Sequence, residues 1–241
     1  DCDGHRSGLR PDDPELLECA AVLTRAGQNL LGVLTHAGSA YDLAAPSPEA
    51  FAALAKQERD AAVSAAQRLR AAGHGCPVVS VGSTPTAFFG RDFTGVSEVR
   101  AGVYMFQDLV MAGLGVCRVE DIALSVLCTV IGRRKSDGNL VVDAGWTALS
   151  RDAGLPGRFA REGYGLVCDV DGKLLPGLRV AETNQEHGII AAREGMCPPL
   201  PVGAQLRILP THACAAAAAF DAYHVCRERE VTALWPRCRG W

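Results

Sequence analysis

His212 and Cys214 are the residues whose types and spacing most directly suggest chemistry in this chain. They lie in the segment LPTHACAAAAAFDAYH, residues 209–224. On an extended segment, side chains two positions apart project to the same face. An imidazole and a thiolate together suit a borderline-soft metal ion, and zinc fits this pair best. The same pattern also fits a histidine and a cysteine packed in a core, and two ligands would leave further coordination positions for water, substrate or another residue.

Other polar residues follow short apolar runs. His36 comes directly after NLLGVLT, the turn GSTPT (82–86) follows PVVSV, and Arg6 and Arg100 each lie near an expected strand end. The carboxyl ends of parallel strands are where barrel enzymes keep their functional groups. Small hydroxyl residues with free backbone N–H groups, as in GSTPT, could hold a phosphate. Each pattern also has an ordinary interpretation as a loop residue, a helix N-cap or a surface arginine.

The elements that must position these residues fall into two regimes, and the first covers residues 1–112. Helical patterns alternate there with short apolar runs, which predicts parallel βα units. Two long helices and about four strand ends amount to half of a (β/α)8 barrel, which typically needs ~250 residues. The helices are expected at 11–26 and 48–72, and the clearest strands at 29–35, 77–82 and 96–99.

The second regime, residues 113–241, predicts an antiparallel β domain. Its apolar segments are rich in Val, Ile and Leu, and hairpin signals such as SDGN (136–139) and DG (171–172) separate them. The alanine run that begins at 215 favours a short helix. The expected strands are 122–131, 139–149, 164–170, 178–182, 187–192, 205–209 and 231–235.

Composition limits the classes of partner. The chain has 241 residues, is 48% hydrophobic and carries a net charge of -3 without a basic block, which argues against nucleic acid or anionic membrane surfaces as partners. Charges or glycines interrupt every hydrophobic stretch, and the opening DCDG is not typical of a signal peptide. The ten cysteines are scattered without a CxxC pair. We interpret most of them as reduced thiols of a cytoplasmic protein.

Taken in order, seven segments resemble the D-serine dehydratase and D-threonine aldolase family, which is related to alanine racemase among the fold-type III pyridoxal-phosphate enzymes. They are DCDGHRSG, GVLTHAGSAY, VGSTPT, SEVRAGVYMFQD, QEHG, LPTHACAAAAAFDAYHV and WPRCRGW. The resemblance spans nearly the whole chain, and 209–225 is its most specific part. It implies an α/β plus β fold, in which 1–112 form the C-terminal half of an alanine-racemase-like (β/α)8 barrel. An antiparallel β domain, 113–241, then carries the metal pair.

The resemblance also implies cofactor-binding roles. Arg6 would contact the phenolic oxygen of pyridoxal 5'-phosphate, His36 would pack on its pyridine ring, and Tyr41 would lie near the substrate. Further contacts are implied at a phosphate site and near the pyridine nitrogen. The phosphate site comprises Ser83, Thr84 and the backbone of Gly102 and Val103, with Tyr104 close by, and Arg100 falls near the pyridine nitrogen.

For the metal, the resemblance implies that His212 and Cys214 are the ligands, with His187 and His224 as candidates beside them. One member of the family's site has no counterpart. The Schiff-base lysine lies near the N-terminus of relatives, whereas lysine occurs here only at 56, 135 and 173, in other contexts. We therefore expect the chain to be a fragment of a longer enzyme. If it were complete, it should be inactive.

The implied activity is a pyridoxal-phosphate- and metal-dependent lyase reaction on a small D-β-hydroxy amino acid. The dehydratase branch pairs His with Cys, whereas aldolases more often pair His with a carboxylate. This favours D-serine dehydratase, which converts D-serine to pyruvate and ammonia. The alternatives are a D-threonine or 3-hydroxy-D-aspartate aldolase and, in another class, an inactive fragment. Fold-type III enzymes are usually dimers, so a homodimer is expected.

Overall fold

The computed structural model describes residues 1–154 and 163–238 and divides into two compact units. The first comprises Asp1–Tyr104 with Leu114–Val116, and the second Met105–Gly113 with Cys117–Trp241. Each unit is described by itself. Within the described residues, no helix has both the length and the apolar composition needed to cross a membrane.

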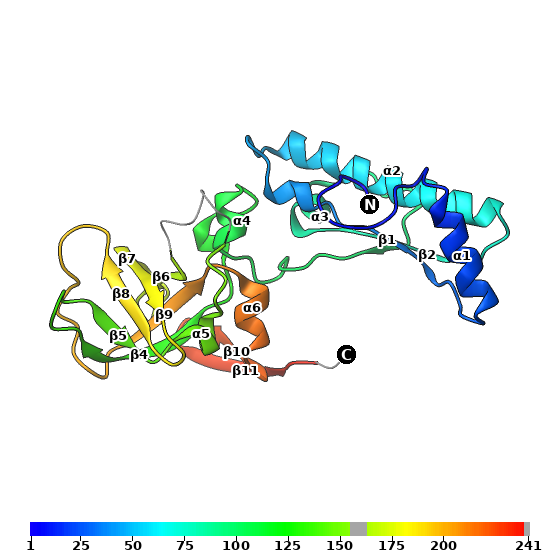
Figure 1. Cartoon of the computed structure of the whole chain (residues 1–241). Coiled ribbons are helices and arrows are strands. Elements are labelled where there is room, and N and C mark those ends of the chain that lie inside the picture. The colour runs from blue at the N-terminus through cyan, green and yellow to red at the C-terminus, as the bar shows by residue number, and fades with distance from the viewer. Residues whose placement is uncertain (155–162, 239–241) are drawn as a thin grey trace. The chain divides into compact units, whose positions relative to one another are not determined.

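The first unit contains a parallel three-stranded sheet in the order β1-β2-β3 (Figure 1). The strands are β1 (Gly32–Leu34), β2 (Val78–Val81) and β3 (Glu98–Val99), each inside a range predicted from the sequence. Residues 1–9, which include Arg6, form a loop, and the strand end expected near Arg6 stays a prediction. The carboxylate of Asp1 accepts the N–H groups of Asp3 and Gly4, which turns the chain there. Closure into a (β/α)8 barrel stays a prediction.

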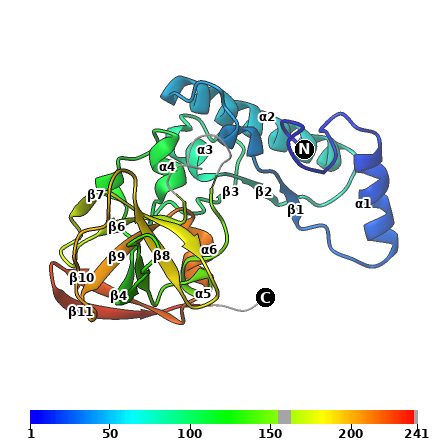
Figure 2. The ribbon, with the colours of Figure 1, turned by 60° about the vertical axis from the view of Figure 1, so that its left-hand side comes forward.

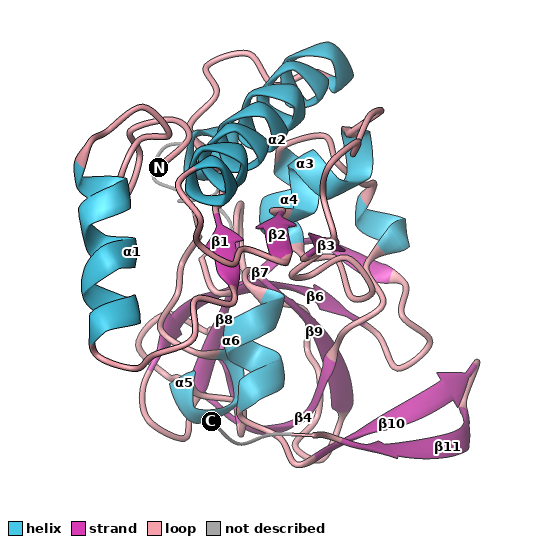
Figure 3. Cartoon of the chain, turned by 90° about the vertical axis from the view of Figure 1, so that its right-hand side faces the viewer, coloured by secondary structure: helices cyan, strands magenta, loops and turns pink. Residues whose placement is uncertain are grey.

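Helices flank this sheet, and the two long ones were predicted. They are α1 (Glu15–Arg25) and α2 (Pro48–Ala71). The unit also contains the short helices η1 (Gly38–Tyr41), before α2, and α3 (Thr84–Phe89), after β2. Helix α2 begins at Pro48 because the Ser47 side chain caps it by accepting the N–H of Ala50. It packs against β1 and β2 (Figure 3).

The second unit is built on a closed six-stranded antiparallel barrel in the order β4-β5-β8-β7-β6-β9 (Figure 2). Side chains along β4 alternate, with Val126, Cys128 and Val130 buried and Leu127 exposed. The antiparallel domain expected from the Val-, Ile- and Leu-rich segments and their hairpin signals is thus present. The strands are β4 (Val126–Arg133), β5 (Leu140–Val142), β6 (Gly165–Cys168), β7 (Leu174–Thr183), β8 (Gly188–Ala192) and β9 (Gln205–Pro210).

Two parts of this unit differ from expectation. The segment 139–149 was predicted as one strand, but it forms β5 followed by helix α5 (Trp146–Leu149), which begins after Gly145. A strand at β10 (Ala222–Arg227) was not predicted; it pairs with β11 (Glu230–Pro236) in a hairpin outside the barrel (Figures 1 and 3). The remaining short helices are α4 (Leu109–Gly113), η2 (Val119–Asp121) and α6 (Ala213–Ala218).

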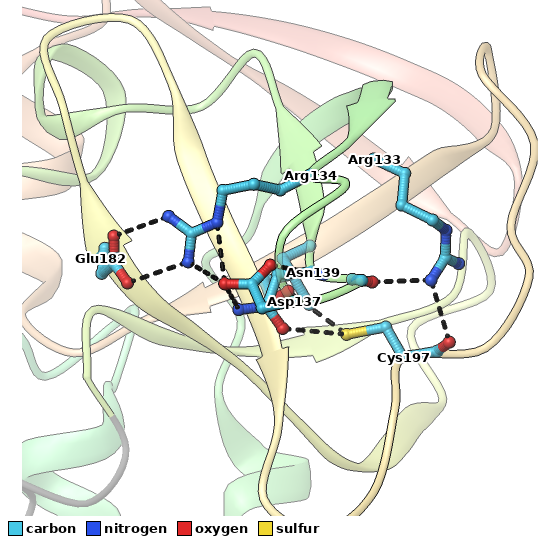
Figure 4. Close-up of polar contacts among 8 residues, drawn as sticks. Arg133, Arg134, Asp137, Asn139, Glu182 and Cys197 are labelled. Carbon is cyan, nitrogen blue, oxygen red and sulfur yellow. Dashed lines mark hydrogen bonds and ion pairs between the residues drawn. The ribbon is translucent and has the colours of Figure 1, made fainter.

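The predicted turn between β4 and β5 is held by arginine side chains (Figure 4). Gly138 has a φ of 74°, a conformation that favours glycine. Arg134 contacts the carboxylates of Asp137, at 2.9 Å, and Glu182, at 3.2 Å. Arg133 donates to the carbonyls of Gly138 and Cys197. The turn is thereby joined to β7 and to the segment that follows β8.

Leu140 is fully buried in the barrel core. Replacing it with alanine should lower the free energy of unfolding by about 2–5 kcal/mol, because the variant loses the free energy of burying the side chain and also contains a cavity. Arg134→Ala should change it little, since its ion pairs are open to solvent. Urea unfolding followed by circular dichroism measures both. If both variants lost the same free energy of unfolding, Leu140 would not lie in the barrel core as described.

Candidate functional site

Three of the expected residues follow the carboxyl ends of the parallel strands, and hydrogen bonds connect them. His36 follows β1, and its Nδ1 lies 3.0 Å from the carbonyl oxygen of Gly82, which follows β2. Arg100 follows β3 and donates to the carbonyl of Thr35 at 2.5 Å. The residues that sequence patterns place after separate strands thus lie together at one edge of the sheet.

Gly82 allows the ends of β2 and β3 to approach closely. Its φ is +129°, and a Cβ there would lie 2.2 Å from the carbonyl oxygen of Arg100. Such a contact would force backbone to move, so a larger residue at 82 would displace Arg100 or the turn after β2.

The turn expected to hold a phosphate is locked by a capping box. Ser83 caps α3, its side chain accepting the N–H of Thr86, while the Thr86 hydroxyl accepts the N–H of Ser83. Thr84, the first helical residue, has no intrahelical acceptor for its N–H. Its hydroxyl accepts the N–H of Val103 at 2.9 Å, which joins the turn to the segment after β3. Tyr104 is half exposed, and its ring lies against Phe88.

Arg6 and His36 line one cavity of about 340 Å³ in the first unit. Arg6 is exposed in the N-terminal loop. The Tyr41 ring stacks on His36, with centroids 6.0 Å apart. The Asp3 carboxylate accepts both the N–H and the hydroxyl of Ser39, which holds the Arg6 loop against η1. The structure therefore brings Arg6, His36 and Tyr41 to neighbouring positions.

The first unit fits a ligand with an aromatic ring and a phosphate. The Nε2 atom of His36 is buried and has no hydrogen-bond partner in the described part of the chain. A buried, unpartnered nitrogen costs free energy unless a ligand or water contacts it. Ser83 and Thr84 lie in the turn that Gly82 connects to His36, Val103 is hydrogen-bonded to that turn, and Arg100 adds a positive charge. These residues could hold pyridoxal phosphate.

His212 and Cys214 come together in the second unit, though not as expected. The prediction that both lie on an extended segment is wrong for Cys214, because α6 begins at Ala213. His212 is the extended N-cap residue of this helix, with φ -129° and ψ 110°. The His212 side chain makes no capping hydrogen bond to the helix, and its ring is free to contact neighbouring side chains. The two side chains are within hydrogen-bonding range.

The His212 ring is also held by a carboxylate that the sequence did not indicate. Its Nδ1 donates to Asp152 Oδ2 at 2.5 Å. Hydrogen bonding to Cys214 and then to Asp152 raises the pKa of His212 to about 9. Burial alone would raise the pKa of the Asp152 carboxyl, but the hydrogen bond from His212 opposes burial, and on balance the pKa of Asp152 is lowered. With Nδ1 engaged, Nε2 of the ring is the nitrogen left for a metal.

A second carboxylate holds the backbone of the metal motif. Asp108 is buried, and its two oxygens accept the N–H groups of Ala213 and Met111, each at 2.9 Å. Burial raises the pKa of Asp108. Thr211, also buried, donates through its hydroxyl to the carbonyl of Gly163. The residues on both sides of His212 are therefore fixed.

His187 and His224, expected beside the metal pair, are exposed, and Asp152 is the residue that contacts His212. Asp152 lies 60 positions from His212 and Asp108 lies 105 from Ala213, so no local spacing could have indicated either pair. Residues 1–154 and 163–238 contain no group of three or more His, Cys, Asp or Glu side chains that could hold a metal. Within these residues, His212 and Cys214 would give a metal two protein ligands and leave its other positions open.

Two family models match the chain. Residues 1–109 match the model of the alanine racemase N-terminal domain, and 123–226 match the putative serine dehydratase domain. The chain thus has the parts of a fold-type III pyridoxal-phosphate protein. It belongs to the family that includes the D-serine dehydratases and D-threonine aldolases.

Three relatives illustrate the range of this family. The D-threo-3-hydroxyaspartate dehydratase of a Delftia species is 52% identical over the whole chain and 64% of its own length, and its structure superposes with a TM-score of 0.87. A cysteine-to-alanine variant of that enzyme has been solved in a metal-free form. The D-serine dehydratase of Dictyostelium discoideum is 29% identical over 93% of the chain and 59% of its own length.

The D-threonine aldolase of Filomicrobium marinum has a TM-score of 0.70 at 26% identity, covering 98% of the chain and 60% of the aldolase. This chain therefore spans about three fifths of the length of these relatives.

Asp152→Asn should weaken metal binding by the full-length protein by about tenfold to a hundredfold, because His212 would lose the acceptor that orients its ring. Asp171→Asn, in an exposed ion pair with Arg229, is the matched control and should leave the affinity unchanged. Titration of metal-stripped protein with zinc measures both. Equal affinities for the Asp152 variant and the wild type would contradict the orienting role.

Proposed function

We propose that this chain is part of a pyridoxal-phosphate- and metal-dependent dehydratase that acts on a D-β-hydroxy amino acid, with D-threo-3-hydroxyaspartate as the first candidate substrate and D-serine as the second. The pairing of His212 with Cys214 carries the proposal, since it offers a metal two ligands and open positions. The identity to the Delftia dehydratase supports 3-hydroxyaspartate. Zinc, a homodimer and a cytoplasmic location belong to the same proposal and rest on the family resemblance and the chain's composition.

A thiolate ligand favours dehydration over retro-aldol cleavage in this family. Thiolate also favours a soft or borderline ion such as zinc over harder ions. A D-threo-3-hydroxyaspartate dehydratase with a cysteine-to-alanine substitution has been solved in a metal-free form, which supports a cysteine ligand in that relative. Retro-aldol cleavage remains the alternative, because relatives of the aldolase type share the same fold.

Residues of the first unit would bind the cofactor, and residues of the second would bind the metal. His36 would pack on the cofactor ring, with Arg6 and Arg100 near its polar groups, and the turn at Ser83 and Thr84 would hold its phosphate. Bound pyridoxal phosphate supplies an electron sink for charge that develops at the substrate α-carbon. His212 and Cys214 would hold a metal that acts as a Lewis acid on the substrate β-hydroxyl. Asp152 would keep the His212 ring oriented.

The full-length protein, loaded with pyridoxal phosphate and zinc, should convert D-threo-3-hydroxyaspartate to oxaloacetate and ammonia in equal amounts. D-Serine should give pyruvate and ammonia at a lower kcat/KM if the first candidate is right. A coupled keto-acid assay and an ammonia assay measure these products. Glycine with an aldehyde as the product would refute dehydration in favour of aldol cleavage.

Cys214→Ala should remove the bound metal and lower kcat/KM by at least about a hundredfold, because the Lewis acid would be lost. Cys226→Ala, at another exposed cysteine, is the control and should keep both metal and activity. Metal analysis of the purified variants, followed by activity with added zinc, tests this. A Cys214 variant with unchanged metal content and activity would overturn the assignment of the metal pair.

A further inference from the structure

Glu58 is a buried carboxylate on the apolar face of α2. The inward residues of this helix recur at helical spacing and include Phe51, Ala55, Ala62 and Leu69. Glu58 falls on the same face, and its exposed fraction is 2%. A buried carboxylate destabilises a fold unless hydrogen bonds replace the water that it has lost. Its position therefore indicates a specific set of donors.

Three donors from different segments surround it. Oε1 accepts the N–H of Ala37 at 2.9 Å and the N–H of Gly82 at 3.0 Å. Oε2 accepts the hydroxyl of Thr86 at 2.8 Å. Ala37 follows β1, Gly82 follows β2, and Thr86 lies in α3. One side chain thus joins the ends of two parallel strands to the helix after the second.

These donors are direct neighbours of the candidate cofactor residues. Ala37 follows His36 in the chain, and Gly82 precedes Ser83. The bond between His36 Nδ1 and the Gly82 carbonyl, 3.0 Å long, closes a ring of contacts through Glu58. This ring sets where the His36 imidazole lies relative to the turn after β2. It leaves Nε2 as the ring nitrogen that has no hydrogen-bond partner among the described residues.

Glu58 also fixes the direction of the Thr86 hydroxyl. That hydroxyl donates to Glu58, so its lone pairs are free to accept the N–H of Ser83 at 3.0 Å. The same carboxylate therefore orients the Thr86 hydroxyl of the capping box that shapes the Ser83–Thr84 turn.

We propose that Glu58 is a positioning residue for the pyridoxal-phosphate site, an inference that rests on the proposed function. Its carboxylate holds the His36 ring and the Ser83–Thr84 turn at a constant separation. Pyridoxal phosphate, whose ring would contact His36 and whose phosphate would contact the Ser83–Thr84 turn, then binds without reordering the loops after β1 and β2. Binding therefore loses less free energy to ordering of the protein. Since both of its oxygens accept bonds inside the unit, its contribution is to geometry and not to proton transfer.

The test is the affinity of the cofactor-stripped full-length protein for pyridoxal phosphate, followed by tryptophan fluorescence and by the absorption of the bound cofactor. Glu58→Ala removes all three bonds and should weaken binding at least tenfold. Glu58→Asp keeps the charge but is one methylene shorter, and it should also weaken binding at least tenfold. Glu49→Ala, at an exposed glutamate of the same helix, should bind as the wild type does.

Glu58→Gln should restore affinity to within about threefold. Its amide oxygen can accept both N–H groups, and the Thr86 hydroxyl can donate instead to the Ser83 carbonyl, 3.3 Å away. This rescue separates positioning from charge. If Glu58→Ala does not fold, as judged by circular dichroism, the Asp and Gln variants decide the question.

The inference is overturned if folded Glu58→Asp binds pyridoxal phosphate as tightly as the wild type, or if Glu58→Gln binds as weakly as Glu58→Ala or Glu58→Asp. Failure of the wild type to bind the cofactor would overturn the proposed function together with it. Wild-type binding with unaffected Glu58 variants would leave the proposed function standing and remove only the positioning role.

Discussion

The double pairing of β9 is the constraint on which the second unit depends. This strand hydrogen-bonds to β4 on one side and β6 on the other, which closes the barrel and removes any open strand edge from it. Because pairing with β4 fixes its register as far as Ile208 and pairing with β6 as far as Pro210, the chain leaves the barrel at one defined point. Two residues later His212 caps α6. The place of His212 just beyond the barrel therefore follows from the pairing of β9.

Buried carboxylates complete the positioning in both units. Asp108 accepts the N–H of Ala213, between the two metal-binding candidates, and Glu58 accepts the N–H groups next to His36 and Ser83. In each case an acid inside the protein binds backbone donors of the loops that carry function. Such a bond is strong in a poorly solvated interior, and its loss leaves a charge without partners, so the loops have little freedom to move.

The sequence predicted the elements whose signals are local. The parallel strands before His36 and Ser83 and the caps of α2 follow from apolar runs and from Ser-Pro spacing. Segments rich in Val, Ile and Leu, with hairpin signals between them, predicted the strands of the barrel. These signals did not indicate β10, which follows the alanine-rich helix directly, or the helix that Trp146 begins after Gly145. The partners of the site were out of reach for another reason, since Asp152 and Asp108 meet the His212 segment only through the tertiary fold.

The central claim is that His212 and Cys214 bind a metal together. X-ray absorption spectroscopy of the zinc-loaded full-length protein tests it most directly, because sulfur and nitrogen ligands lie at different distances from zinc. The account predicts one sulfur at about 2.3 Å and at least one imidazole nitrogen at about 2.0–2.1 Å, with the sulfur absent in Cys214→Ala. A first shell of nitrogen and oxygen alone in the wild type would contradict it.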